Sequence, residues 1–258
     1  MPISSIRVVS VCLILGQIVP GCGGTDESGA PRPPRRASPA PVPSPSLHES
    51  QCLNEAEVAR DESLRTRSIR GDVSGDGVDD RVHVAVDDDA DVGCRAFLLV
   101  VHGDELVSVS LDVDGMDPTL GLPALRELRQ VDGAGGADVV VDLIAGASTV
   151  FAGVYSMATG ELARVTIQGS EPPAQDLFAF GGGVAQLSAV DCAGEGSILI
   201  STAVPRGARY LVTRNYYTAT AGALTSRGEA ATRKVAFEKL PARFSEFAGP
   251  PFGSCPAD

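Results

Sequence analysis

Three similar segments follow one another along the chain at a spacing of roughly sixty residues. In each, a turn rich in Gly, Asp or Glu leads into a β-branched run: RVHVAV after Asp80, DVVVDLI from Asp138 and SILIST from Ser197. The starting residues are 58 and 59 positions apart. Because β-branched runs bounded by turn residues favour strands, this internal repeat predicts three similar β units.

A second marker follows the first in every segment. Each segment continues into a predicted hairpin whose turn holds Gly103, Gly160 or Gly222. A fourth candidate strand comes next: LRELRQV, GVAQLSAV and RKVAFEKL, respectively. Four short antiparallel strands are the content of a propeller blade. We therefore predict an all-β fold, a small or partial β-propeller-like array of three four-stranded antiparallel repeats, with a β-sandwich of the same hairpins as the alternative.

The start of the chain indicates export. Residues 1–21 contain Arg7 followed by an apolar run, which is typical of a signal peptide. Residues 22–47 are rich in Pro, Ser and Ala without an apolar period, and this composition predicts a disordered linker. Residues 48–258 remain as the β-repeat domain.

The repeat domain is strongly acidic. The whole chain has a formal net charge of −12, and because residues 1–47 contribute +2, residues 48–258 carry −14. Such a surface lacks the positive charge that neutralises phosphates in nucleic-acid binding, so we expect no DNA or RNA partner. Divalent cations, in contrast, are attracted to it.

Four of the six cysteines belong to the predicted domain. Cys12 lies in the signal peptide and Cys22 at its end, which leaves Cys52, Cys94, Cys192 and Cys255. An even number in an exported chain favours two disulfides, and none of the spacings is that of a zinc site. Three pairings are open, and the preferred one joins Cys52 with Cys255 and Cys94 with Cys192.

The turn from Gly71 to Asp80 has the residues of a calcium site. Oxygen-bearing side chains stand at loop positions 1, 3, 5 and 9, and Gly77 permits the bend that brings the Val78 carbonyl inward. Clustered carboxylates repel one another unless a cation neutralises them. An EF-hand is excluded because position 12 is His83 and a strand follows. The turn therefore predicts one structural Ca²⁺, with candidate ligands Asp72, Ser74, Asp76, Val78 and Asp80.

The phrases GDVSGDGVDDRV, DLIAGASTVFAGVY and AVDCAGEG resemble the FG-GAP or VCBS repeat of integrin-like β-propellers, over about residues 68–238. The likeness is closest to short exported actinobacterial lipoproteins that contain this repeat. It implies four-stranded blades, the calcium ligands given above, and interaction rather than catalysis. The turns at 132–138 and 191–197 are shorter and lack the middle acidic residues, so we expect no ion there.

The end of the signal peptide resembles a bacterial lipobox. Val19, Pro20 and Gly21 precede Cys22. The resemblance implies that Cys22 is lipidated and anchors the protein on the outer face of the cell membrane, although Pro20 departs from the usual pattern. Secretion without a lipid is the alternative.

No catalytic signature accompanies these features. The sequence contains no G-x-S-x-G or H-E-x-x-H motif, and the absence of Trp removes the usual stacking surface for sugars. We therefore expect no enzymatic activity. The predicted function is a calcium-stabilised binding or scaffold module with an unknown protein or cell-envelope partner. An envelope hydrolase acting on polysaccharide and a substrate-capturing lipoprotein are the alternatives.

Histidines and tyrosines receive structural interpretations. His48, His83 and His102 have no metal-site spacing and are interpreted as neutral surface residues. Tyr216 and Tyr217 alternate along a predicted strand, which places one ring inward and one outward.

Overall fold

A computed structural model describes residues 61–87, 90, 94–170, 175–194, 196–228 and 230–257. These residues belong to one compact unit within Ser46–Asp258. The predicted signal peptide, Cys22, the linker and Cys52 lie outside the described residues. The described part is mostly β, which confirms the all-β class. It contains no helix long and apolar enough to cross a membrane.

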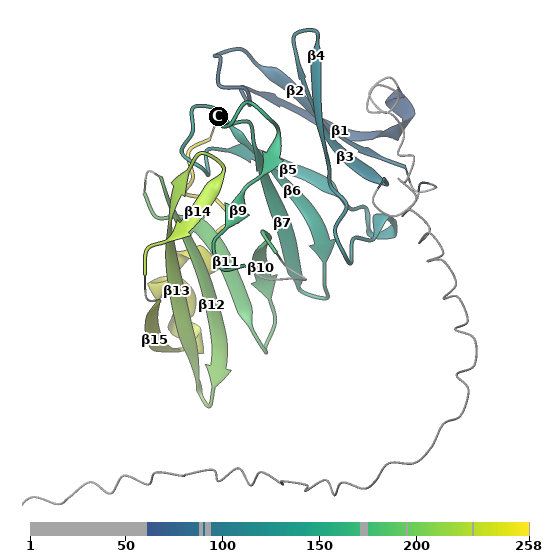
Figure 1. Cartoon of the computed structure of the whole chain (residues 1–258). Helices are drawn as coiled ribbons and strands as arrows, with labels where there is room; N and C mark the ends of the chain where they lie inside the picture. Colours follow the sequence, from purple (N-terminus) through teal and green to yellow (C-terminus); the bar gives the residue numbers. More distant parts are fainter. Residues whose placement is uncertain are drawn as a thin grey trace, which may run out of the picture. The chain divides into compact units, whose positions relative to one another are not determined.

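The first repeat forms a four-stranded antiparallel sheet (Figure 1). The strands follow one another in chain order, so each pairs with the next. A 3-10 helix, η1 (Glu62–Leu64), precedes this sheet, whose strands are β1 (Arg65–Gly71), β2 (Asp80–Val86), β3 (Ala96–His102) and β4 (Glu105–Ser110).

The second and third repeats share one eleven-stranded sheet. Its order is β5-β6-β7-β10-β11-β12-β13-β14-β9, with β8 paired to β7 and β15 paired to β13. Neither sheet closes into a barrel. Before this sheet lies η2 (Pro118–Leu120), and its strands are β5 (Ala124–Arg129), β6 (Asp138–Ala145), β7 (Thr149–Ser156), β8 (Ala163–Arg164), β9 (Thr166–Ile167), β10 (Phe178–Gly182), β11 (Leu187–Cys192), β12 (Ser197–Arg206), β13 (Arg209–Thr220), β14 (Ala223–Ser226) and β15 (Ala231–Ala236).

The repeat markers stand at equivalent places in the structure. Strands β2, β6 and β12 begin at Asp80, Asp138 and Ser197, as the repeat predicts. The candidate fourth strands of the first two units pair differently from the prediction. LRELRQV forms β5, which pairs with β6, and GVAQLSAV forms β11, which pairs with β12. Each repeated turn therefore joins the first two strands of a unit.

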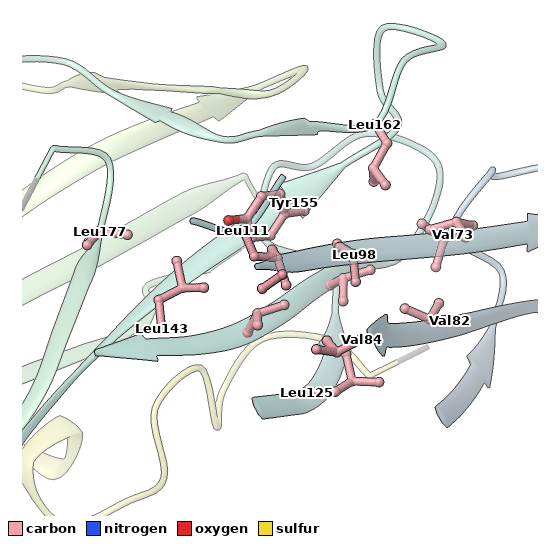
Figure 2. Close-up of a cluster of buried hydrophobic side chains, with 14 residues drawn as sticks. Val73, Val82, Val84, Leu98, Leu111, Leu125, Leu143, Tyr155, Leu162 and Leu177 are labelled. Atoms are coloured by element: carbon pink, nitrogen blue, oxygen red, sulfur yellow. The ribbon is translucent and has the colours of Figure 1, made fainter. Parts of the chain in front are cut away.

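Strand β6 has a hydrophobic core on both of its faces. Val139, Val141 and Leu143 pack in a cluster shared with β2, β3, β5 and β7, as Figure 2 shows for several members. Val140 points to the opposite face and packs in a second cluster, with Ile198 and Phe252 among its members. Because successive side chains of a strand alternate between faces, burial on both sides requires the continuous apolar run that the sequence shows.

The chain ends in short helical turns and a segment that returns to the sheet. The turns are η3 (Phe237–Lys239), α2 (Leu240–Arg243) and η4 (Ser245–Phe247). Beyond them, the Phe252 amide donates to the Val190 carbonyl at 3.0 Å. The Gln130 amide donates to the Pro256 carbonyl at 3.0 Å. This returning segment thus contacts strands of both the second and third repeats.

The disulfide pairing differs from the preferred prediction. Cys192 is bonded to Cys255, so neither Cys94–Cys192 nor Cys52–Cys255 forms. The physical reason is the returning segment, which carries Cys255 onto the end of β11. Cys94 is disulfide-bonded as well.

Candidate functional site

The turn between β1 and β2 is organised around the carboxylate of Asp72. Its Oδ1 accepts hydrogen bonds from the amides of Gly75 (2.7 Å) and Asp76 (3.0 Å), and its Oδ2 accepts one from Gly77 (2.8 Å). Gly77 has φ +86°, a conformation that a side chain would strain. Asp72 therefore holds the turn in shape while its carboxylate stays inside the loop.

The side-chain oxygens of three predicted calcium ligands lie close to one another. Ser74 Oγ lies 3.5 Å from Asp72 Oδ1 and 3.3 Å from Asp76 Oδ1. The Val78 amide donates to the same Asp76 oxygen at 2.8 Å, and the Val78 side chain is exposed. The structure thus brings Asp72, Ser74 and Asp76 together on one side of the turn.

Asp80 faces a different partner. Its side chain is buried, and Oδ2 accepts hydrogen bonds from the amides of Val73 (2.9 Å) and Ser74 (2.7 Å). Its other oxygen, Oδ1, lies 2.7 Å from Nδ1 of His102 at the end of β3. Asp80 therefore fastens the turn to the start of β2 and to the neighbouring hairpin.

His102 is the side-chain partner of Asp80 in this acidic turn. The hydrogen bond to Asp80 raises the pKa of His102 above its ordinary value, and the charges of Asp76 and Glu105 add to the effect while desolvation opposes it. Nε2 of His102 lies 3.5 Å from Asp76 Oδ2. Interpreting His102 as a neutral surface residue missed this role. The signal was its place one residue before the Gly103 turn, at the end of a strand that pairs with β2.

His83 also differs from the sequence interpretation. It lies in the middle of β2, opposite Leu99 of β3, and is 6% exposed. Strand β2 lies between β1 and β3, so His83 is a buried residue of a central strand rather than a surface histidine.

The oxygen atoms of the first turn provide some, but not all, of the ligands that a hard cation needs. Asp72, Ser74 and Asp76 offer oxygens on one side of the turn, which is the chemistry that Ca²⁺ prefers. Asp80 uses its oxygens for two amides and His102. Among the described residues, no group of three or more His, Cys, Asp or Glu side chains is close enough to hold a metal ion. Any ion here would depend on Ser74, backbone carbonyls and water for its remaining ligands.

The second turn repeats the hydrogen bonding of the first without its exposed carboxylates. Asp138 Oδ2 accepts from the amides of Val131 (2.6 Å) and Asp132 (2.8 Å). Asp132 Oδ2 accepts from Ser156 Oγ (2.7 Å) and from the Gly222 amide (2.8 Å). Both aspartates are 1% exposed. This turn therefore holds a buried pair of carboxyl groups.

The two carboxyl groups of the second turn interact electrostatically. Burial raises the pKa of Asp138 to about 7, and the negative charge of Asp132 contributes in the same direction. Within the described part of the chain, Asp138 Oδ1 has no hydrogen-bond partner. A proton on Asp138 thus relieves both the missing contact with water and the repulsion from Asp132.

The repeated turns lie against one another through their backbones. The Ala137 amide donates to the Asp72 carbonyl at 2.7 Å, and a Cβ on Gly136 would overlap with the Val73 carbonyl oxygen. Gly133 of the second turn in turn approaches Gly196 of the third. The glycines and alanines of the second turn therefore permit close backbone contact where the first turn has acidic side chains.

In the third turn, Asp191 forms hydrogen bonds with the returning segment. Asp191 Oδ1 accepts from the Ser254 amide at 2.7 Å, and Asp191 Oδ2 accepts from Ser254 Oγ at 2.8 Å. The position equivalent to Asp80 is Ser197, whose Oγ accepts from Arg227 Nη1 at 2.9 Å. The third turn is thus stabilised by contacts with Ser254 and Arg227, which the first turn does not have.

Comparison with known proteins gives no match: no family model, no curated protein and no solved structure is significantly similar to this chain. The relation to FG-GAP or VCBS repeats consequently stays a prediction from the sequence.

Proposed function

We propose that this chain is an exported, lipid-anchored binding or scaffold module whose FG-GAP-like or VCBS-like repeats are stabilised by one Ca²⁺ in the first turn. The observation that carries the proposal is the grouping of the Asp72, Ser74 and Asp76 oxygens in a turn that contacts the next repeat. Cys22 would carry the lipid, and residues 22–47 would hold the domain away from the membrane.

The ion would act by stiffening the contact between repeats. Ca²⁺ supplies two positive charges to a turn whose carboxylates otherwise repel one another. Asp72, Ser74, Asp76 and the Val78 carbonyl would hold it. Asp80, a predicted ligand, would reach it only through the oxygen that also contacts His102. Because the Asp72 carbonyl accepts a hydrogen bond from the Ala137 amide, an ion that stabilises the first turn would also stabilise its contact with the second turn.

A propeller-like arrangement of the repeats is part of this proposal. The sheet of the second repeat has the first repeat against one face of β6 and residues of the third repeat against the other. The three repeated turns are in backbone contact in chain order. Neighbouring blades pack face to face, as the first two repeats do, whereas the second and third repeats also share hydrogen-bonded strands through β10.

Binding is favoured over hydrolysis because the carboxyl group whose pKa is raised, that of Asp138, is inaccessible. A glycosidase needs two carboxyl groups on either side of a bound sugar, one of them with a raised pKa. Burial raises the pKa of Asp138 to about 7, but Asp138 and its neighbour Asp132 are each 1% exposed. A polysaccharide has no access to them, so this pair supports a structural role.

Calcium titration of the mature chain tests the proposal. We expect heat of binding and a higher unfolding temperature with millimolar Ca²⁺, because an ion that binds only the folded state stabilises it. Asp72→Asn and Asp76→Asn should abolish both effects. Asp114→Asn removes an exposed carboxylate outside the turn and should preserve them. Absence of heat and of any shift in the unmodified chain would overturn the calcium site.

A further inference from the structure

A groove of about 540 Å³ lies over the part of β13 that pairs with β15. Figure 1 shows these two strands beside each other, with the short C-terminal helical turns next to them. Its lining combines apolar, aromatic and cationic side chains: Val212, Arg214, Tyr216, Ala231, Arg233, Lys234, Val235, Arg243 and Phe244.

The register of the two strands explains how these residues come together. Arg214 pairs with Ala231 and Val212 pairs with Arg233, so these residues share one face of the sheet. Leu240 and Phe244 pack in a buried cluster with Val212 on that face. The groove therefore has an apolar base of sheet and helical turn, with cationic groups along it.

Arg214 is fixed in position by buried partners. Glu246 is 6% exposed, and its Oε1 lies 2.9 Å from Arg214 Nε, while Arg214 Nη2 donates to Oε2 at 3.3 Å. Ser201 Oγ donates to the same Glu246 Oε1 at 2.9 Å. The guanidinium carbon lies 5.7 Å from the centre of the Tyr216 ring and 5.5 Å from that of Phe244. Arg214 is thus held rigidly beside two aromatic rings.

Arg233 and Arg243 are exposed, and neither forms an ion pair within the described part of the chain. Lys234 also lines the groove, but it alternates with Arg233 along β15, so its side chain belongs to the other face of the sheet. The surrounding sequence is basic in an otherwise acidic domain, since residues 206–243 contain eight Lys and Arg but two Asp and Glu. The local charge is therefore opposite to that of the remaining surface.

We propose that this groove binds a small molecule that carries a phosphate group on a ring, the chemistry shared by sugar phosphates and nucleotides. The guanidinium groups of Arg233 and Arg243 match the geometry of phosphate oxygens. Tyr216 offers a ring face for the non-phosphate part. The groove volume falls within the range of about 300–1,000 Å³ of small-molecule sites. This inference rests on the proposed binding role but not on calcium.

Titration calorimetry of the mature chain at low ionic strength, without Ca²⁺, tests the inference. The probes are glucose 6-phosphate, adenosine 5′-monophosphate, inorganic phosphate, glucose and glucuronate. We expect binding of one or both ring phosphates, weaker binding of inorganic phosphate, and none of glucose or glucuronate. Which of the two ring phosphates binds more tightly distinguishes a sugar phosphate from a nucleotide as the ligand.

Variants identify the groove as the site. Arg233→Gln and Arg243→Gln should each weaken binding by about tenfold, since each removes a charge-assisted contact. Arg206→Gln removes an exposed arginine outside the groove and should leave affinity unchanged. Tyr216→Ala should weaken binding of the ring phosphates more than that of inorganic phosphate. Arg214 is left intact because its loss would strand the buried Glu246.

Several results would overturn the inference. The first is that no phosphate compound binds. The second is that Arg206→Gln, Arg233→Gln and Arg243→Gln bind the ring phosphates with equal affinity. The third is that the chain binds glucuronate more tightly than the ring phosphates. Binding of inorganic phosphate as tightly as of the ring phosphates would overturn the ring component. Thermal unfolding of every variant must match that of the unmodified chain. Because these titrations contain no Ca²⁺, a failure to bind phosphate compounds can be distinguished from a failure to bind calcium.

Discussion

Asp80 and Asp138 use the same carboxylate oxygen in the same way, each accepting two backbone amides through Oδ2 within its own repeated turn. They differ at Oδ1. In Asp80 this oxygen lies 2.7 Å from His102 Nδ1, whereas in Asp138 it has no hydrogen-bond partner among the described residues. The first repeat therefore gives its buried carboxyl group an imidazole partner, whereas in the second repeat burial raises the pKa of Asp138.

The first prediction concerns the pH dependence of stability. The pKa of Asp138 is raised by burial and by Asp132 from an ordinary value of 3.8 to about 7, so the folded state keeps a proton that the unfolded state loses. This contribution therefore makes the free energy of unfolding fall as pH rises between about 4 and 7, by up to about 1.4 kcal/mol per pH unit, and is constant above that range.

Asp138→Asn should remove this contribution and be more stable than the unmodified chain at pH 8. The measurement is urea unfolding of both proteins from pH 4 to 8, and the difference between them isolates Asp138 from other titrating groups. Asp114→Asn is the control for loss of an exposed carboxylate. Parallel pH profiles for Asp138→Asn and the unmodified chain would contradict the assignment.

The second prediction concerns His102. His102→Ala leaves Oδ1 of the buried Asp80 without its imidazole partner, and a buried polar atom without a hydrogen bond is costly. We expect a lower midpoint of urea unfolding at pH 6. Asp104→Ala changes an exposed residue of the same hairpin turn and should have a smaller effect. Equal midpoints for the two variants would argue against the Asp80 contact.

The third prediction separates two adjacent glycines. A Cβ at Gly136 would overlap with the Val73 carbonyl, whereas a Cβ at Gly135 would have no atom within 4 Å. Gly136→Ala should therefore destabilise the domain by about 1–3 kcal/mol, the usual cost of overpacking. Gly135→Ala should be close to neutral or slightly stabilising. Urea unfolding measures both, and a neutral Gly136→Ala would show that the two turns separate easily.

The fourth prediction concerns the disulfides. Non-reducing peptide mapping of the mature chain should recover Cys192 joined to Cys255. Cys94 is also oxidised, and Cys12 lies in the predicted signal peptide while Cys22 is the predicted lipidation site, so we expect Cys94 to be joined to Cys52. Cys192→Ser combined with Cys255→Ser should cost about 2–4 kcal/mol of stability. Recovery of a peptide linking Cys94 to Cys192 would contradict the structure.

Local features of the sequence located the starts of three strands but not the strand pairing, and the predicted strand RKVAFEKL was wrong beyond Ala236, where η3 begins. Turn residues followed by β-branched runs predicted the starts of β2, β6 and β12, since both signals lie within a few residues. Pairing of β5 with β6 rather than with the first unit depends on contacts between strands, which the repeat spacing does not record. The same limit applies to β10, which joins the second and third repeats into one sheet.

The sequence predicted which residues form the candidate site, but it did not predict the contacts that these residues make with other strands. Alternating oxygens and Gly77 indicated the turn, and the structure groups three of those side chains. The contact of His102 with Asp80 joins residues 22 positions apart and arises from the pairing of β2 with β3. The cysteine pairing joins residues 63 positions apart and depends on the returning segment that carries Cys255.

The burial of β6 on both faces has a consequence for cooperativity. If the first repeat separated from the second, Val139, Val141 and Leu143 would meet water, and separation of the third would expose Val140. Neither neighbour can detach without leaving the central strand half solvated. Unfolding should therefore proceed in a single all-or-none step rather than one unit at a time, with coincident transitions in fluorescence and circular dichroism.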